Sequence, residues 1–471
     1  MNLEGKKVVV VGLGRSGVAL VEFLCRRGAR VIATDKKSAT ELGDHMLTYL
    51  HTLNVQLELD QHSTATWLGA DLILLSPGVP LSIEPLQRAR EAHIPVLAEV
   101  ELAARFLRGR IVGVTGSNGK TTVTTLIGVI LSRAGFFTQV GGNIGTPLTS
   151  LVDSSREDGF VVVELSSFQL ETIDTLRPHM AAMTNISPDH LDRHGSLGEY
   201  INAKRRIFMN QTAEDWAVLN ADDPIVIQMM YDTQARPILF SRRRELDEGV
   251  FVQQDQIVCR IDAQEQSLIR LDEIPLRGWH NVENVMAAMA AGWAAGASVE
   301  AMREAVKTFP GVEHRLEWIG RMDEVDYYND SKATNVDSTI KALEAFDGNL
   351  IVILGGRDKG SSFEPLRPLI AKKARQVLLL GEASAKIASA LKGAAPLTFV
   401  TSMAEAVERA HELAEPGDTV LLAPACASFD MFENFEHRGR VFKDEVRKLK
   451  LLSVSSSRLN LRIEEAEPLN H

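Results

Sequence analysis

A glycine-rich turn followed by lysine and threonine is the clearest chemical signal in this sequence. The apolar residues 111–115 lead into Gly116, Ser117, Asn118, Gly119, Lys120, Thr121 and Thr122. Glycines let backbone N–H groups approach phosphates, and the N-terminus of a following helix favours an anion. A lysine can reach the outer phosphates and a threonine hydroxyl can hold Mg²⁺. We predict a nucleoside triphosphate site, and an ordinary strand–turn–helix corner is the alternative.

This turn is two residues tighter than the standard phosphate loop, because Val114 stands where that loop has a glycine.

A second glycine turn, Gly12-Leu-Gly-Arg-Ser-Gly17, lies between a predicted strand at 7–11 and a predicted helix through residue 24. The next predicted strand, at 30–34, runs into Asp35. This is a dinucleotide-type fingerprint, in which glycines approach a diphosphate and the carboxylate binds a ribose hydroxyl. It suits NAD, FAD or a nucleotide sugar, and a tight turn without ligand is the alternative.

Three further residues could take part in phosphate chemistry. Glu164 follows a buried strand predicted at 160–163, where open parallel sheets bind ligands and a carboxylate can hold Mg²⁺, although it could also cap the next helix. His190 lies in a loop after a later apolar strand and could reach the same edge, and an exposed loop histidine is the alternative. Helical spacing places Lys204 on one apolar face with Tyr200. A desolvated lysine has a lowered pKa and can react as a neutral amine, and snorkelling to solvent is the alternative.

Three predicted strands in the C-terminal part of the chain are each followed by a polar segment. These segments are residues 329–335, 355–359 and 425–430. Together these loops would form a pocket for a small dicarboxylate.

The length of 471 residues suggests about three domains. Strands and helices alternate along the chain, which is typical of α/β folds with parallel sheets. We predict a Rossmann-like N-terminal domain at 1–98, a P-loop ATPase-like central parallel-sheet domain at 99–311, a Rossmann-like C-terminal domain at 312–450 and a polar, frayed tail at 451–471.

Composition narrows the choice of partners and compartment. The net charge of −11 and the pI near 5.6 argue against nucleic-acid or anionic-membrane surfaces. The three cysteines form no metal-binding pattern, which fits a reducing compartment. The longest run of small apolar residues, at 285–297, is too short to insert in a membrane. The first five residues do not resemble a signal peptide, so we expect a cytoplasmic protein.

Eight motifs in one order resemble those of the Mur ligases of bacterial cell-wall synthesis, and the resemblance runs from the first strand to about Lys450. The motifs are residues 115–122 (Thr-Gly-Ser-Asn-Gly-Lys-Thr-Thr), 141–145 (Gly-Gly-Asn-Ile-Gly), 164–171 (Glu-Leu-Ser-Ser-Phe-Gln-Leu-Glu), 189–193 (Asp-His-Leu-Asp-Arg), 280–284 (His-Asn-Val-Glu-Asn), 314–315 (His-Arg), 329–335 (Asn-Asp-Ser-Lys-Ala-Thr-Asn) and 425–428 (Ala-Cys-Ala-Ser).

The resemblance implies an ATP-dependent ligase of peptidoglycan precursor synthesis, and hence of cell shape and division. Its implied substrates are UDP-N-acetylmuramoyl-L-alanine and D-glutamate, joined through an acyl phosphate with release of ADP and phosphate. Siblings that add a diamino acid carry Asp-Asn-Pro-Arg in the third domain, and its absence from this sequence favours D-glutamate.

The same resemblance implies roles for single residues. ATP would contact residues Gly116 to Thr122 of the turn and also Asn281, Asn284, Arg315, Asp330 and Lys332. Two Mg²⁺ ions would be held by Thr121, Glu164, His190 and Lys204, the last as a carbamate made with CO₂. The catalytic residues would be Lys120, Asn143, His190 and Lys204. The UDP-sugar would contact Gly14, Arg15, Ser16, Asp35, Ser76, Gly78 and Asn143, and D-glutamate would contact Thr334, Lys359, Ser428 and Phe435. A monomer is expected.

Two departures from the family pattern bear on the uridine contacts. Lys36 and Lys37 stand where the pattern has Thr-Arg, and Arg15 stands where an apolar residue is usual. Three other functions stay open on the motifs alone. They are a folylpolyglutamate synthase-like ligase, an NAD-dependent oxidoreductase fused to an ATPase, and a regulatory nucleotide switch.

Overall fold

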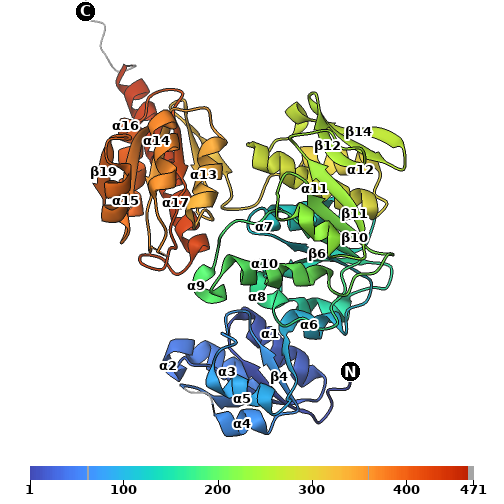
Figure 1. Cartoon of the computed structure of the whole chain (residues 1–471). Helices are drawn as coiled ribbons and strands as arrows, with labels where there is room; N and C mark the ends of the chain where they lie inside the picture. Colours follow the sequence, from blue (N-terminus) through green and yellow to red (C-terminus); the bar gives the residue numbers. More distant parts are fainter. Residues whose placement is uncertain (61–62, 359, 465–471) are drawn as a thin grey trace, which may run out of the picture. The chain divides into compact units, whose positions relative to one another are not determined.

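The chain is built from three sheets with helices packed on them (Figure 1). The computed structural model describes residues 1–60, 63–358 and 360–464. It divides into two compact units. The first holds Met1–Pro275 and Val282–Phe309, and the second holds Leu276–Asn281 and the chain from Pro310 onward. None of the helices in these described ranges combines the length and apolar character needed to cross a bilayer.

The N-terminal sheet is parallel, in the order β3-β2-β1-β4-β5. Alternate valines of β1 face opposite sides: Val8 and Val10 pack with α1, whereas Val9 and Val11 pack with α4 and α5. Burial on both faces explains why β1 reads as an unbroken apolar run. The elements are β1 (Lys7–Val11), α1 (Arg15–Arg26), β2 (Arg30–Thr34), α2 (Ala39–Leu42), α3 (Asp44–Thr52), β3 (Gln56–Glu58), α4 (Thr64–Leu68), β4 (Leu72–Leu75), α5 (Glu84–Glu91) and β5 (Val96–Ala98).

The central sheet has nine strands in the order β14-β13-β12-β11-β10-β9-β6-β8-β7. It is parallel from β7 to β12 and ends in the antiparallel strands β13 and β14. Its strands are β6 (Arg110–Thr115), β7 (Thr138–Gly142), β8 (Phe160–Glu164), β9 (Met180–Met183), β10 (Trp216–Asn220), β11 (Arg236–Ser241), β12 (Gly249–Gln253), β13 (Gln256–Ile261) and β14 (Gln264–Arg270). Its helices are α6 (Glu99–Ala104), α7 (Lys120–Arg133), α8 (Ser167–Leu170), α9 (Leu191–His194), α10 (Leu197–Arg205) and α12 (Val299–Lys307), while α11 (Trp279–Ala294) carries residues of both units.

The C-terminal sheet runs β15-β16-β20-β17-β18-β19, with only β15 antiparallel to its neighbour among the described strands. Val352 and Leu354 face α13, α14 and α15, whereas Ile351 and Ile353 face α16 and α17. The elements are β15 (Glu317–Met322), β16 (Val325–Asn329), α13 (Val336–Glu344), β17 (Leu350–Leu354), α14 (Arg367–Lys373), β18 (Ala374–Leu380), α15 (Ser384–Leu391), β19 (Leu397–Val400), α16 (Met403–Leu413), β20 (Thr419–Leu422) and α17 (Phe435–Glu464).

The predicted fold class, three α/β domains with parallel sheets, is confirmed. The predicted domain bounds stay predictions. One element differs from expectation: α17 continues to Glu464, past the predicted start of a frayed tail at residue 451. The physical reason is that no glycine or proline interrupts residues 440–464. The tail residues 465–471 lie outside the described residues.

Candidate active site

The glycine turn at 116–119 lies at the carboxyl end of β6, between the parallel neighbours β8 and β9. Gly116 has φ 140° and Gly119 has φ 84°, conformations that side chains disfavour. A Cβ on Gly116 would lie 1.9 Å from Thr184 Oγ1, and one on Gly119 would lie 2.2 Å from Asn284 Oδ1. The positive φ angles, together with these close contacts, therefore favour glycine at both positions.

The loop after β9 holds this turn in place. Ser117 N donates to the carbonyl of Asn185 at 2.8 Å, and Asn118 N donates to Asn185 Oδ1 at 2.9 Å. Thr184 Oγ1 donates to the carbonyl of Asn118 at 2.6 Å. Sequence reasoning missed Thr184 and Asn185. The available signal was their place directly after an apolar strand, since parallel strands end at one edge of a sheet.

Two lysines converge on the same backbone. Lys120 Nζ donates to the carbonyls of Gly116 at 3.0 Å and Ser117 at 2.8 Å. Lys204 Nζ donates to the Gly116 carbonyl at 2.7 Å and lies 3.4 Å from Thr115 Oγ1. Lys204 is 1% exposed, so its side chain does not snorkel to solvent. Burial, together with repulsion from Lys120, lowers the pKa of Lys204 well below its usual value.

Glu164 is buried at the end of β8 beside this turn. Its Oε1 accepts from Asn143 Nδ2 at 2.9 Å, while Oε2 has no hydrogen-bond partner among the described residues. Its charge acts on Lys204. It does not cap the next helix, because Ser166 occupies the N-cap of α8. A buried carboxylate oxygen with unused lone pairs beside a phosphate-type turn fits a divalent cation.

His190 is the N-cap of α9 and has a left-handed conformation, with φ 52°. Its ring packs edge-on against Phe168 at 5.0 Å between centroids. The guanidinium of Arg193 lies over the same Phe168 ring, 4.0 Å from the centroid. Asp189, next to His190, acts electrostatically on Lys204. The structure thus joins Lys120, Glu164 and Lys204 in one charge cluster and places His190 in a loop that borders it.

The polar side chains beside the N-terminal glycine turn form hydrogen bonds with nearby backbone groups. Asp35 accepts from Leu13 N at 2.6 Å and from Lys37 N at 2.9 Å. Ser76 Oγ donates to the Gly12 carbonyl at 2.7 Å. Gly14 is the N-cap of α1, directly before Arg15 and Ser16. The predicted contacts of Gly14, Arg15, Ser16, Asp35, Ser76 and Gly78 with a nucleotide sugar stay predictions.

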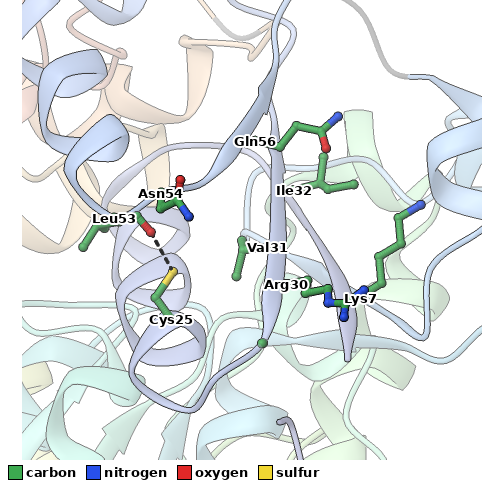
Figure 2. Close-up of a pocket in the computed structure, with 9 residues that line it drawn as sticks. Lys7, Cys25, Arg30, Val31, Ile32, Leu53, Asn54 and Gln56 are labelled. Carbon is green, nitrogen blue, oxygen red and sulfur yellow. Dashed lines mark hydrogen bonds between the residues drawn. The ribbon is translucent and has the colours of Figure 1, made fainter. Parts of the chain in front are cut away.

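Figure 2 shows a cavity of about 420 Å³ in the same N-terminal sheet. It is lined by Lys7 and Arg30, the first residues of β1 and β2, and so lies at the amino ends of the strands. Open parallel sheets bind ligands at the other end. Cys25 lines it too, its thiol donating to the Leu53 carbonyl at 3.7 Å, and burial raises the pKa of that thiol. A thiol of this kind is unreactive.

In the C-terminal sheet, Asp330 follows β16 and is fully buried. Burial raises the pKa of its carboxyl group. The nearby Arg315, whose Nη1 lies 3.6 Å from Asp330 Oδ1, acts in the opposite direction and lowers it. Asp330 Oδ2 has no hydrogen-bond partner in the described part of the chain. This acceptor suits a hydroxyl donor. On α11, Asn281 Nδ2 donates to the Arg277 carbonyl at 2.7 Å, and Asn284 lies one turn further along.

Three of the four residues predicted to bind D-glutamate, Thr334, Ser428 and Phe435, follow β16 or β20, which are adjacent parallel strands. Ser428 is buried, and its carbonyl accepts from Phe432 N at 2.9 Å. Lys332 Nζ lies 5.3 Å from the centre of the Phe435 ring. Thr334 N donates to the Lys332 carbonyl at 2.8 Å. Lys359 lies outside the described residues.

Sequence reasoning missed Arg438, which joins the two loops. Its guanidinium donates to Ser331 Oγ at 3.0 Å, to the Ser331 carbonyl at 2.8 Å and to the Cys426 carbonyl at 3.1 Å. Burial lowers its pKa to about 10. No sequence signal separates this arginine from the other charged residues of its helix.

Comparisons with known proteins agree over most of the chain. Three family models match: "Mur ligase MurD-like, N-terminal domain" at 6–98, "Mur ligase middle domain" at 114–292 and "Mur ligase, glutamate ligase domain" at 314–426. The UDP-N-acetylmuramoylalanine--D-glutamate ligase of Acidobacterium capsulatum is 50% identical over 95% of this chain and 97% of its own. The protein of the same name from Koribacter versatilis is 47% identical over 95% and 99%.

Solved structures agree in fold. The UDP-N-acetylmuramate-alanine ligase MurC of Thermotoga maritima superposes with a TM-score of 0.59 at 22% identity, covering 94% of this chain and 99% of that one. A pseudomurein peptide ligase type C from Methanothermus fervidus gives 0.59 at 20% identity, covering 94% and 100%. Relatives that are about half identical over nearly its whole length, with three family domains in order, show that the chain belongs to the Mur ligase family.

Proposed function

We propose that this protein is an ATP-dependent ligase that joins D-glutamate to UDP-N-acetylmuramoyl-L-alanine in peptidoglycan precursor synthesis. The observation that carries the proposal is the near-complete alignment with relatives named for that reaction, at 45–50% identity. An N-terminal domain of the MurD-like type supports the same choice within the family.

The reaction would proceed in two transfers. An oxygen of the alanine carboxylate attacks the γ-phosphorus of ATP, an acyl phosphate forms, and ADP leaves. The amine of D-glutamate then attacks the acyl carbon, loses a proton, and phosphate leaves as the amide forms. Catalysis of phosphoryl transfer consists largely of positioning and charge stabilisation.

The chain supplies these functions around the turn at 116–119. The N-terminus of α7 would stabilise the negative charge of the phosphates, and Lys120 is the first residue of this helix. Asn143, which hydrogen-bonds Glu164 at 2.9 Å, would orient the reacting carboxylate. Arg315, Asp330 and Lys332 would contact the phosphates and ribose, with Asn281 and Asn284 toward the adenine. Asp330 Oδ2 has the acceptor capacity that a ribose hydroxyl needs.

Mg²⁺ is the metal that the family uses with ATP, and the free oxygen of Glu164 fits it. Two ions would be held by Thr121, Glu164, His190 and a modified Lys204. When bound, they neutralise charge that develops on the phosphates.

Lys204 would act as a carbamate. A neutral lysine amine attacks CO₂, the N–C bond forms and the proton goes to solvent, which leaves a carboxylate-like ligand. The support is the burial of Lys204 beside Lys120, which favours the neutral amine.

The remaining assignments belong to the same proposal. The turn at 12–17 and the loop with Ser76 and Gly78 would bind the UDP moiety. D-glutamate would contact Thr334, Lys359, Ser428 and Phe435. The domain bounds 1–98, 99–311 and 312–450, a monomeric state and a cytoplasmic location complete the proposal.

Phosphate release with UDP-N-acetylmuramoyl-L-alanine, ATP and a panel of amino acids tests the function. The panel is D-glutamate, L-glutamate, L-lysine and diaminopimelate. We expect release only with D-glutamate, and ADP rather than AMP as product. Release with L-glutamate on a folate acceptor would establish the folylpolyglutamate alternative, hydride transfer at the nicotinamide absorbance would establish the oxidoreductase, and ATP turnover without any amino acid would establish the switch.

A further inference from the structure

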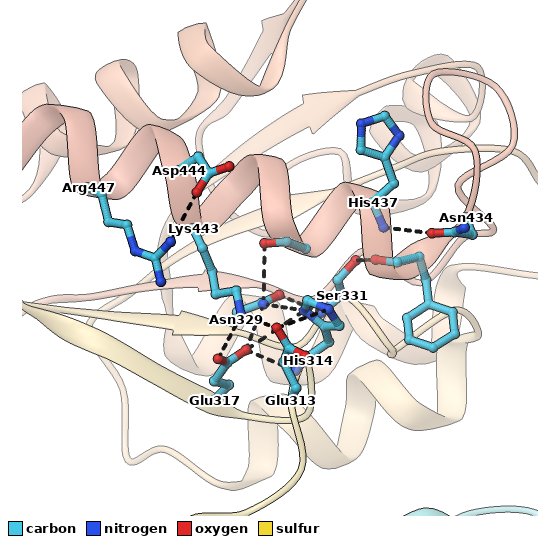
Figure 3. A network of polar contacts seen from close by, with 12 residues as sticks. Glu313, His314, Glu317, Asn329, Ser331, Asn434, His437, Lys443, Asp444 and Arg447 are labelled. Atoms are coloured by element: carbon cyan, nitrogen blue, oxygen red, sulfur yellow. Dashed lines mark hydrogen bonds and ion pairs between the residues drawn. The ribbon is translucent and has the colours of Figure 1, made fainter. Parts of the chain in front are cut away.

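A polar cluster with a buried centre, in the second unit, has no role in the chemistry described above. It joins the segment at 313–317 to the end of β16 and to α17 (Figure 3). We call it the His314 cluster, and its members are Glu313, His314, Glu317, Asn329, Gly439 and Lys443. His314 is 2% exposed and Asn329 is fully buried. Glu313, at the edge of the cluster, is exposed, but the buried groups at its centre must satisfy their hydrogen bonds within the protein.

Lys443 balances the two acids of the His314 cluster. Its ammonium bonds Glu313, and it donates to Glu317 Oε1 at 3.0 Å. The ligand atoms of Glu313, His314 and Glu317 lie within 4.8 Å of one another, a spacing that would suit a metal ion. The ammonium of Lys443 already supplies the positive charge at this place.

The protonation state of His314 follows from its neighbours. Asn329 Oδ1 accepts from Ser331 N at 3.1 Å, which fixes the amide orientation. Its Nδ2 therefore donates to His314 Nδ1 at 2.8 Å, and the imidazole is neutral with its proton on Nε2. Burial and Lys443 lower the pKa of His314, against the opposite effect of the Glu313, Glu317 and Glu436 carboxylates.

Gly439 lets α17 approach the imidazole. A Cβ at this position would lie 2.3 Å from His314 Nδ1, so any side chain would displace the ring or the helix. One turn earlier, the Phe435 carbonyl accepts from Ser331 Oγ at 2.8 Å. One turn later, Lys443 closes the contact with the acids. A single face of α17 thus holds both the 313–317 segment and the loop after β16.

These contacts lead directly to the proposed nucleotide site. The His314 carbonyl accepts from Lys332 N at 3.1 Å, and Leu316 N lies 3.4 Å from Asp330 Oδ1. His314 and Leu316 have left-handed φ values of 64° and 42°. Such conformations cost free energy and persist only where the surroundings hold them. Arg315 lies between these two residues.

We propose that Lys443 and Gly439 are positioning residues, which act through His314 and Asn329 to hold Arg315, Asp330 and Lys332 in place for ATP. This inference rests on the proposed function for the identity of the ligand.

Lys443→Met provides the main test. The variant leaves the Glu313 and Glu317 carboxylates facing each other beside His314, so the pKa of His314 rises. The protonated imidazole cannot accept from Asn329. We expect the KM for ATP to rise about tenfold, with the KM values for D-glutamate and the UDP-sugar within about twofold of wild type.

The pH profile distinguishes this mechanism from general loss of structure. The KM defect of Lys443→Met should shrink between pH 6.5 and 8.5, as His314 loses its proton, while wild type stays flat over that range. Lys443→Arg should restore most of the ATP affinity. Lys448→Met, on the exposed side of the same helix and paired with Glu445 three residues earlier, is the matched control and should behave as wild type.

Gly439→Ala is a second variant, expected to raise the KM for ATP in the same selective way. Binding of a non-hydrolysable ATP analogue by calorimetry separates the two proposals. If the wild-type protein lacks D-glutamate ligase activity but Lys443→Met still weakens the analogue, the proposed function fails and the positioning role stands. Equal changes in all three KM values, or lower melting temperatures with unchanged ATP affinity, would overturn the positioning role.

Discussion

The two glycine-rich turns of the first unit lie at corresponding places, yet their polar neighbours are used in opposite ways. Each follows a strand with parallel neighbours on both sides and precedes a helix. Around Gly12–Gly17, Asp35 and Ser76 bond to the turn itself. Around Gly116–Gly119, one oxygen of Glu164 has no partner in the described chain, and Lys204 is buried against Lys120.

On the proposed function, this difference would separate a site that only binds from a site that also reacts. A turn that satisfies its own side chains keeps a fixed shape and offers backbone N–H groups to a diphosphate. A site that leaves a carboxylate oxygen without a partner and buries one lysine beside another lowers the stability of the fold, and such groups gather where charge must be handled. We therefore expect substitutions at the second turn to lower kcat, and substitutions at the first to raise the KM for the UDP-sugar.

The largest effect is expected at Lys204. Lys204→Ala should lower kcat by about a thousandfold or more, because it removes the proposed carbamate ligand. Added short carboxylic acids, such as acetate, should restore part of the activity by replacing the missing carboxylate. Steady-state phosphate release measures both effects. Arg205→Ala, next in sequence but partly exposed and paired with Asp232, is the control. Full activity of untreated Lys204→Ala would show that the lysine only packs.

Glu164→Gln should have the next largest effect. The amide oxygen of glutamine can still accept the hydrogen bond from Asn143, but the side chain loses the negative charge that attracts Mg²⁺. We expect kcat to fall about a hundredfold and the Mg²⁺ concentration for half-maximal rate to rise about tenfold or more. A Mg²⁺ titration of phosphate release measures this shift. An unchanged Mg²⁺ requirement would remove Glu164 from the metal site.

Strong periodic signals made much of the fold predictable. The strands expected at 7–11 and 30–34 have those same bounds in the structure, because strands buried on both faces read as continuous apolar runs. The apolar face that Lys204 shares with Tyr200 left burial and snorkelling both open, and the structure buries Lys204. Local patterns carry such information because the residues that create them are neighbours in the same element.

Long-range contacts left no comparable trace in the sequence. Arg438 and Lys443 sit among other charged residues of α17, and their partners lie more than a hundred residues away at Ser331 and Glu317. The hydrogen bond of Asp35 was not predictable either. The fingerprint suggested Asp35 as a ribose ligand, and the structure shows that its carboxylate accepts from Leu13 N and so holds the turn. Spacing predicts a residue's face, whereas its partners depend on the tertiary fold.

At the first turn, Asp35→Asn should have a smaller and different effect. The amide can accept from only one of the two backbone donors, Leu13 N and Lys37 N, so the turn loses a charge-assisted bond. We expect about 1–2 kcal/mol lower stability and a KM for the UDP-sugar raised about tenfold, with kcat at saturation nearly unchanged. Thermal melts and substrate titrations test this. A large loss of kcat instead would contradict the division between the two turns.

The smallest effect is expected at Tyr200, whose hydroxyl lies 3.0 Å from Ser117 Oγ beside the second turn. Burial raises the pKa of Tyr200, so the phenol stays neutral throughout the pH range of the assay. Ser117 keeps its bond to the Ser187 carbonyl when the phenol is removed. Tyr200→Phe should therefore cost about 1 kcal/mol of stability and raise the KM for ATP only about twofold.

The pH profile of kcat should be the same for Tyr200→Phe and wild type up to pH 10, since the tyrosine never ionises there. Tyr231→Phe, at a position 78% exposed, is the matched control for the loss of a hydroxyl group. A hundredfold fall in kcat for Tyr200→Phe would mean that the phenol takes part in the chemistry. The distinction between groups left unsatisfied and groups already bonded would then fail within the second turn itself.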